Sequence, residues 1–178
     1  MNLVSAAPRE LSVAALCKRG ELPRAAATLF ASHGTEVFAF LEAFLDDHTT
    51  RSLFGEVQER AMAELLDLDH DKVNLRTWLF SLARRAHLTH VQALEAQPAP
   101  SSRAVVSSQP RSGPRTKAGF DALAVDDKHL LVLCLDRGLR FDELAEILYG
   151  ATDDDARRKR WAEALQARCT ELQATLAT

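Results

Sequence analysis

Apolar residues recur along most of the chain with the spacing of an amphipathic α-helix. At about 100° per residue, one face is formed by Leu75, Leu79, Leu82 and Ala86. Similar stripes predict helices over residues 11–17, 23–33, 37–45, 53–65, 126–136, 141–149 and 153–176, with a break near Gly34. No segment shows a convincing period-two alternation of a β-strand. The pattern therefore predicts an all-α fold.

Residues that favour helix ends stand where this pattern breaks. Asn74 is the expected N-cap of the helix that begins at Leu75, and Thr49 or Thr50 is the expected cap of the helix before it. Gly138 and Gly150 lie where helix C-caps are expected. Short breaks between several helices are typical of a helical bundle.

One segment interrupts the helical pattern for much longer. Residues 97–117 are dense in Pro, Ser and Gly and have no apolar period, which is typical of a flexible linker. We therefore divide the chain into a helical domain at 1–96, a linker at 97–119 and a second helical domain at 120–178. A short helix, a glycine turn and a longer helix in the second domain match a helix-turn-helix.

The predicted helix from Leu75 has a second face with different chemistry. Arg76, Phe80, Arg84 and His87 line up about a third of a turn from the apolar stripe. Alternating positive charges and rings can hold a nucleic-acid strand through phosphate contacts and base stacking. The same residues also suit a face that is solvated or packed on a neighbouring helix. Both interpretations stay open on the helix pattern alone.

Composition and charge restrict the class of protein. The chain has 47% hydrophobic and 26% charged residues, the balance of a globular protein. No apolar run is long enough to cross a bilayer, so we expect no membrane insertion and a cytoplasmic location. The net charge is −3, and basic residues outnumber acidic ones only in residues 96–120. Two acidic modules do not favour strong binding to phosphates.

No catalytic or metal centre is apparent from the spacing of reactive residues. Cys17, Cys134 and Cys169 are far apart in the sequence and lack C-x-x-C spacing, so they predict neither a disulfide framework nor a zinc site. His87 and His90 have no third ligand nearby. We therefore expect no catalytic residues, no metal and no cofactor, and we expect that the protein is not an enzyme.

Four segments in order resemble one protein family. They are LCKRGE, LFASHG and VFAFL within residues 16–41, SLFGEV at 52–57, LRTWLFSLAR at 75–84 and GLRFDELAEIL at 138–148. The last three are similar to the family patterns D-L-V-Q-E-V, L-R-x-W-L-F-x-I-A-R and G-L-S-Y-x-E-I-A-E-x-L. On these segments the chain resembles bacterial RNA polymerase sigma factors of the two-domain, extracytoplasmic-function (ECF) type.

The resemblance implies a function and a set of contact residues. It implies a region 2-like domain that binds core RNA polymerase, a region 4-like helix-turn-helix that reads the −35 promoter element, and an anti-sigma protein as regulator. The implied polymerase contacts are Leu53, Glu56, Val57 and Arg60. The implied −10 DNA contacts are Arg76, Phe80, Arg84, Arg85 and His87. The implied −35 contacts are Arg157, Arg158, Lys159 and Arg160.

The chain also departs from the family pattern at positions that carry function. Gly55 stands in the polymerase-binding helix, where glycine lowers helix stability by roughly 1 kcal/mol relative to alanine. Arg85, Thr89 and Gln92 replace the family's Asn, Asp and Arg in the promoter-melting helix, and Asp153–Asp155 begin the helix expected to read DNA. These departures leave an alternative: a degenerate sigma-like protein that binds an anti-sigma factor or another protein partner without recognising a promoter.

Overall fold

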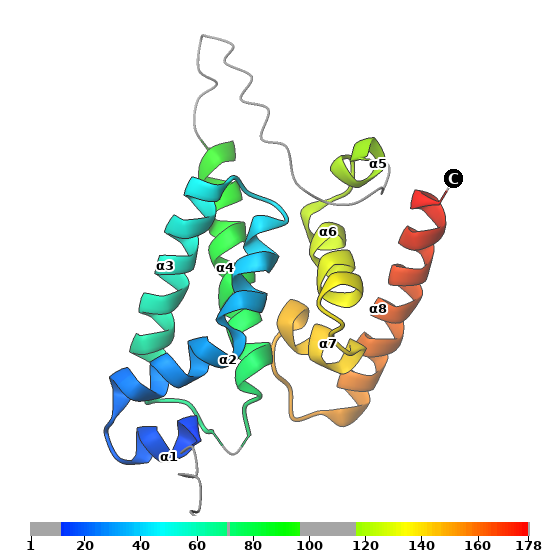
Figure 1. The fold of residues 1–178 in the computed structure, drawn as a ribbon. Coiled ribbons are helices and arrows are strands. Elements are labelled where there is room, and N and C mark those ends of the chain that lie inside the picture. The colour runs from blue at the N-terminus through cyan, green and yellow to red at the C-terminus, as the bar shows by residue number, and fades with distance from the viewer. Residues whose placement is uncertain (1–11, 71, 97–116, 178) are drawn as a thin grey trace, which may run out of the picture.

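Every regular element in the described part of the chain is helical, which confirms the all-α prediction (Figure 1). The computed structural model describes residues 12–70, 72–96 and 117–177. Its elements are α1 (Val13–Lys18), α2 (Leu22–Glu42), α3 (Asp47–Glu64), α4 (Leu75–Glu95), α5 (Lys117–Asp121), α6 (Val125–Leu131), the π-helical turn η1 (Val132–Asp136), α7 (Phe141–Tyr149) and α8 (Asp155–Leu176).

The first four helices pack into one group, which we call the N-terminal unit. Helix α2 contacts α1, α3 and α4, and α3 also contacts α4. Asp46 caps α3 by accepting a hydrogen bond from the Thr49 amide at 2.9 Å. The expected cap at Thr49 or Thr50 is therefore wrong: the preceding carboxylate takes this role, and Thr50 is buried. Asn74 caps α4 as predicted.

Helix α2 runs without a break through the position where the sequence predicts one. Gly34 lies in the interior of α2, with helical residues on both sides. A Cβ atom added to it would lie 3.5 Å from the Phe30 side chain and 3.6 Å from the Phe54 ring. These are ordinary van der Waals distances, so a side chain as small as alanine would also fit here. The predicted break at Gly34 is wrong because α2 is continuous from Leu22 to Glu42, and glycine lowers helix stability without ending the helix.

The helices after the described gap form the C-terminal unit. Helix α6 continues directly into η1, and α8 contacts both α6 and α7. Gly138 and Gly150 end η1 and α7 with φ of +62° and +93°, a conformation that glycine adopts without strain. Asp154 caps α8 by accepting a hydrogen bond from the Arg157 amide at 3.0 Å.

The two units pack against each other. Helix α4 lies against α7, and the ring of His129 on α6 lies 5.5 Å from that of Phe40 and 5.0 Å from that of Phe44. Buried apolar residues from both units belong to one hydrophobic cluster. Most of the predicted linker, residues 97–116, lies outside the described residues, while its expected end overlaps α5. The division into two domains stays a prediction.

Candidate functional site

Helix α4 carries two buried faces. Its apolar stripe packs inside the N-terminal unit, where Leu79, Leu82 and Ala83 are fully buried and Ala86 is nearly so. The core stripe predicted from the sequence is therefore confirmed. The second face carries Arg76 and Arg84, and both of these side chains bind oxygens of the C-terminal unit.

Arg76 and Phe80 are already engaged with protein groups. Arg76 Nε donates to Glu36 Oε2 at 2.7 Å, and its Nη2 donates to the Arg137 carbonyl oxygen at 2.8 Å. The guanidinium lies 5.7 Å from the centroid of the Phe80 ring. That ring has no exposed surface and meets Phe40 edge-to-face at 5.8 Å. In this arrangement Phe80 is a core residue and has no free face for a base.

Arg84 makes the clearest charged contact between the units. Its Nη2 donates to Asp126 Oδ1 at 2.7 Å, and the arginine side chain is 16% exposed against 70% for the aspartate. Its Nε is buried and has no hydrogen-bond partner among the described residues. A carboxylate therefore occupies one side of a guanidinium that the sequence assigned to a DNA phosphate. Asp126 is a partner that the local sequence of α4 does not reveal.

Arg85 differs from its neighbours because it is exposed. It lines a cleft of about 280 Å³ between α4 and α7, together with Trp78 and Glu146. Among the five α4 residues expected to contact DNA, Arg85 alone is exposed; His87 and Phe80 are buried, and Arg76 and Arg84 are partly covered. The structure thus places Arg76, Phe80, Arg84 and His87 on one face, as predicted, but that face is covered.

A pair of imidazoles lies at the centre of the contact between the units. His87 Nδ1 and His129 Nε2 are 2.7 Å apart, which requires one ring to donate a proton and the other to accept it. The Phe44 ring stacks on His87 at 5.0 Å. Burial lowers the pKa of His87 to about 4 and that of His129 to about 3. Both rings are therefore neutral near pH 7.

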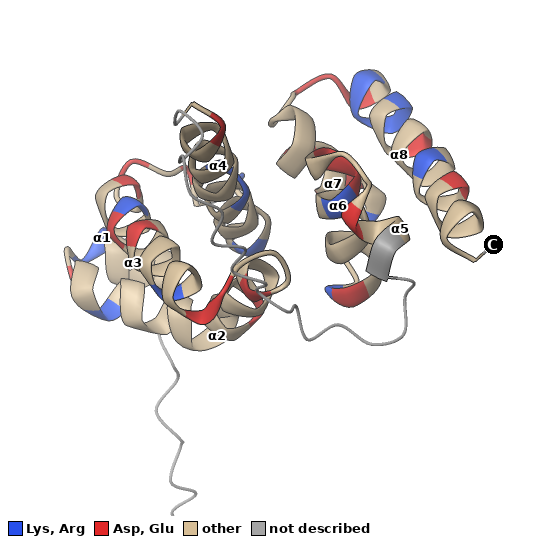
Figure 2. Cartoon of the chain, turned by 90° about the horizontal axis from the view of Figure 1, so that it is seen from above, with Lys and Arg blue, Asp and Glu red and all other residues tan. Residues whose placement is uncertain are grey.

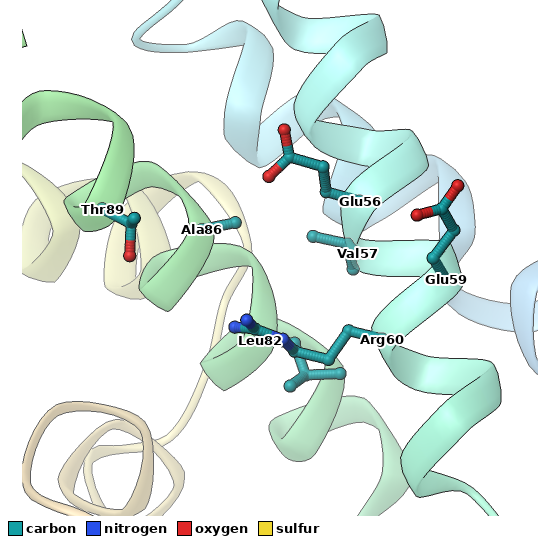
Figure 3. A pocket seen from close by; sticks show the side chains of 7 residues that line it. All are labelled: Glu56, Val57, Glu59, Arg60, Leu82, Ala86 and Thr89. Atoms are coloured by element: carbon teal, nitrogen blue, oxygen red, sulfur yellow. The ribbon is translucent and has the colours of Figure 1, made fainter. Parts of the chain in front are cut away.

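The residues expected to bind polymerase divide into two kinds. Leu53 and Val57 are buried against the other helices of the N-terminal unit, while Glu56 and Arg60 are exposed. Figure 3 shows Arg60 extending from α3 toward Leu82 on α4. Leu53 and Val57 therefore hold α3 against its neighbouring helices. Of the four predicted polymerase contacts, only Glu56 and Arg60 are accessible to a partner.

A shallow groove of about 260 Å³ lies beside these charges, between α3 and α4 (Figure 3). Glu59 joins Glu56 and Arg60 along its wall, and within the described residues none of the three forms an ion pair. Unpaired charges at a groove are available to a protein partner without breaking an internal contact. Glu59 is not among the polymerase contacts that the resemblance to sigma factors implies.

The basic run at the start of α8 is partly neutralised within its own helix (Figure 2). Arg158 Nη1 lies 3.2 Å from Asp155 Oδ1, and Arg157 Nε lies 3.9 Å from Asp154 Oδ2. Arg157 also lies over the Trp161 ring at 5.9 Å. Lys159 and Arg160 are exposed and have no ion pair among the described residues. The four predicted −35 contacts therefore reduce to two fully available cations.

The described residues contain neither a metal cluster nor a membrane-spanning helix. No group of three or more His, Cys, Asp or Glu side chains among them is arranged to hold a metal ion. None of their helices has the length and hydropathy needed to cross a bilayer.

Comparisons with known proteins identify no relative of this chain: no family model, curated protein or solved structure matches it.

Proposed function

We propose that this chain is an RNA polymerase sigma factor of the ECF type, in a state in which its promoter-melting helix is covered by its own C-terminal unit. The proposal is supported by the four sequence segments in family order and by helices α3, α4, α7 and α8 at the places where that order needs them. No catalytic group is required, because contacts with unpaired bases and phosphates supply the free energy of strand opening.

The observation that carries the proposal is the nature of the contacts that cover α4. Arg84 binds the Asp126 carboxylate, and Arg76 binds a backbone carbonyl of the C-terminal unit. Each guanidinium thus donates to a protein oxygen at the position where it would donate to a phosphate oxygen of DNA. Such a face can exchange internal oxygens for those of DNA once the units separate.

A second candidate function is favoured by a specific observation. His87 is 4% exposed and contacts His129 of the C-terminal unit, so the face loses a buried ring contact when it opens. A sigma-like protein that binds an anti-sigma factor or another protein, and never opens, would keep this contact permanently. Its partner would meet the exposed charges of α3 or the unpaired Lys159 and Arg160.

Charge reversal at Arg60 tests the polymerase-binding surface. Arg60→Glu should weaken co-elution with core RNA polymerase by at least about tenfold, since it removes an exposed cation and leaves three acidic side chains at the groove. Arg51→Glu is the matched control on the same helix, and it should leave co-elution nearly unchanged. Gel filtration with purified core enzyme measures both. Absence of co-elution for the parent chain contradicts the sigma-factor proposal.

Charge reversal at Asp126 tests whether opening exposes a DNA-binding face. Asp126→Arg places two cations together at the contact between the units, so the radius of gyration in X-ray scattering should increase. Affinity for a labelled single-stranded DNA should increase about tenfold. Glu95→Arg, at the exposed end of α4, has the same charge change away from the contact and is the control. Equal DNA affinities for the two variants would show that charge alone acts.

Transcription from the DNA upstream of the gene that encodes this chain distinguishes the two candidate functions. With core polymerase present, a sigma factor yields promoter-dependent transcripts, and Asp126→Arg yields more than the parent chain. A protein-binding sigma homologue yields none from either, whatever its affinity for polymerase. This second result would overturn the first proposal and retain the second.

A further inference from the structure

A cleft lies where helix α4 of the N-terminal unit meets helix α7 of the C-terminal unit. Its volume is about 280 Å³, and both helices supply its walls. A direct contact joins the two walls: Asn74 Nδ2, at the start of α4, donates to Glu143 Oε1 on α7 at 3.4 Å. Small-molecule sites occur preferentially at such junctions. This cleft is smaller than the pockets that hold drug-sized molecules, so it suits a ligand of few atoms.

Two charges of opposite sign line this cleft. Arg85 stands on α4 and is exposed, and Glu146 stands on α7 and is half-buried. Within the described residues neither side chain forms an ion pair, either with the other or with a neighbour. The last turn of α7, up to Gly150, also borders the cleft, and the C-terminal end of a helix carries partial negative charge. The cleft therefore offers a cation on its α4 wall and negative charge on its α7 wall.

Apolar side chains make up much of the remaining lining. Trp78 and Leu88 stand on α4, two turns before and one turn after Arg85, and Ile147 follows Glu146 on α7. Trp78 and Leu88 are half-buried, so part of each side chain is open to an occupant of the cleft. An indole ring offers a broad apolar surface to such an occupant. The lining therefore favours a ligand that carries an apolar group beside its charges.

We propose that this cleft binds a free α-amino acid with an apolar side chain. The carboxylate of the ligand pairs with Arg85, and its ammonium pairs with Glu146 and the last carbonyl oxygens of α7. The apolar side chain of the ligand packs on Trp78. A zwitterion satisfies both walls at once, whereas a simple anion places a like charge beside Glu146 and a simple cation places one beside Arg85.

The position of the cleft gives the ligand a structural consequence. Each unit supplies one of the two charged walls, so the amino acid binds only while α4 and α7 lie together. A ligand that binds one arrangement of a protein shifts the population toward that arrangement. The amino acid therefore keeps α4 covered and engages Arg85, one of the predicted −10 contacts. Its effect on DNA binding rests on the proposed sigma-factor function, but the binding itself does not.

Titration of the full chain with L-leucine and with L-phenylalanine tests the proposal. The readout is the indole N–H signal in nuclear magnetic resonance spectra, because the chain has two tryptophans. Trp78 lines the cleft, and Trp161 stands on α8 outside it. The Trp78 signal should move with a Kd of about 0.1–1 mM, since so small a ligand makes few contacts, and the Trp161 signal should stay in place. Trp161→Phe assigns the two signals.

Two analogues of leucine separate its charged groups. 4-Methylpentanoate lacks the ammonium, and 3-methylbutylamine lacks the carboxylate. The parent chain should bind each at least about tenfold more weakly than leucine. Glu146→Gln should lose the preference over 4-methylpentanoate, and Arg85→Gln should lose the preference over 3-methylbutylamine. Arg51→Gln and Glu95→Gln change exposed charges on α3 and at the end of α4, away from the cleft, and they should keep the parent preferences.

Several outcomes contradict the proposal. One is a Trp78 signal that stays in place at about 10 mM of both amino acids. Another is equal affinity of the parent chain for leucine and 4-methylpentanoate, which would make the cleft a simple anion site. A third is an unchanged preference in both Arg85→Gln and Glu146→Gln, with circular dichroism showing that each keeps its helices. None of these measurements involves polymerase, so this proposal and the sigma-factor proposal fail separately.

Discussion

Replacement of Phe80 by alanine should lower the free energy of unfolding by about 3–5 kcal/mol, the usual cost of removing a buried aromatic ring. Phe80 is fully buried, and its ring contacts Phe40 edge-to-face and lies beneath the Arg76 guanidinium. Alanine leaves a cavity at the point where α2 and α4 meet, and it removes the apolar support of an arginine that binds the C-terminal unit. Urea unfolding followed by circular dichroism measures the loss.

A control on the same helix separates core packing from helix propensity. Leu94→Ala truncates an α4 side chain that is 54% exposed, and it should change the free energy of unfolding by less than about 1 kcal/mol. A loss of that small size at Phe80 would mean that the ring is turned to solvent and free to stack on a base. The size of this loss thus decides between the two interpretations of the face that the sequence left open.

The positions of the helices were largely predictable because local signals specify them. Asn74 begins α4 and Gly150 ends α7 where the sequence predicts these caps, since capping depends on a few neighbouring residues. Gly34 shows the limit of such signals: glycine is frequent where helices end, yet this one lies inside the continuous helix α2. Asp46 was missed as a cap for a similar reason, because two threonines that follow it are also good caps.

What covers α4 was not predictable from its own sequence. An arc of arginines and rings has the same pattern whether it meets DNA or protein. Its partners in the C-terminal unit, Asp126, His129 and the Arg137 carbonyl, all lie beyond the glycine- and proline-rich segment. The missing information is tertiary contact over long sequence separation.

Acidification should destabilise the contact between the units through the His87–His129 pair. In the unfolded chain a histidine has a pKa of about 6.5, whereas burial lowers the pKa of these two imidazoles to about 4 and about 3. The unfolded state therefore binds more protons below pH 6.5. Their contribution to stability is fully present above that pH and is lost as the pH falls toward 4. Ionisable neighbours lower the two pKa values further: His90 and Lys128 act on His87, and His87 and Arg84 act on His129.

The loss should reach about 1.4 kcal/mol per pH unit for each imidazole within that window. Urea unfolding at a series of pH values measures the slope, and X-ray scattering at the same values measures separation of the units. The double variant His87→Leu, His129→Leu should remove most of the slope, because it removes both hydrogen-bonding partners and leaves neither ring unpaired. His48→Leu, at an exposed histidine, should leave the slope unchanged. If the double variant keeps the parent slope, the acid sensitivity arises elsewhere and the imidazole pair does not hold the units together.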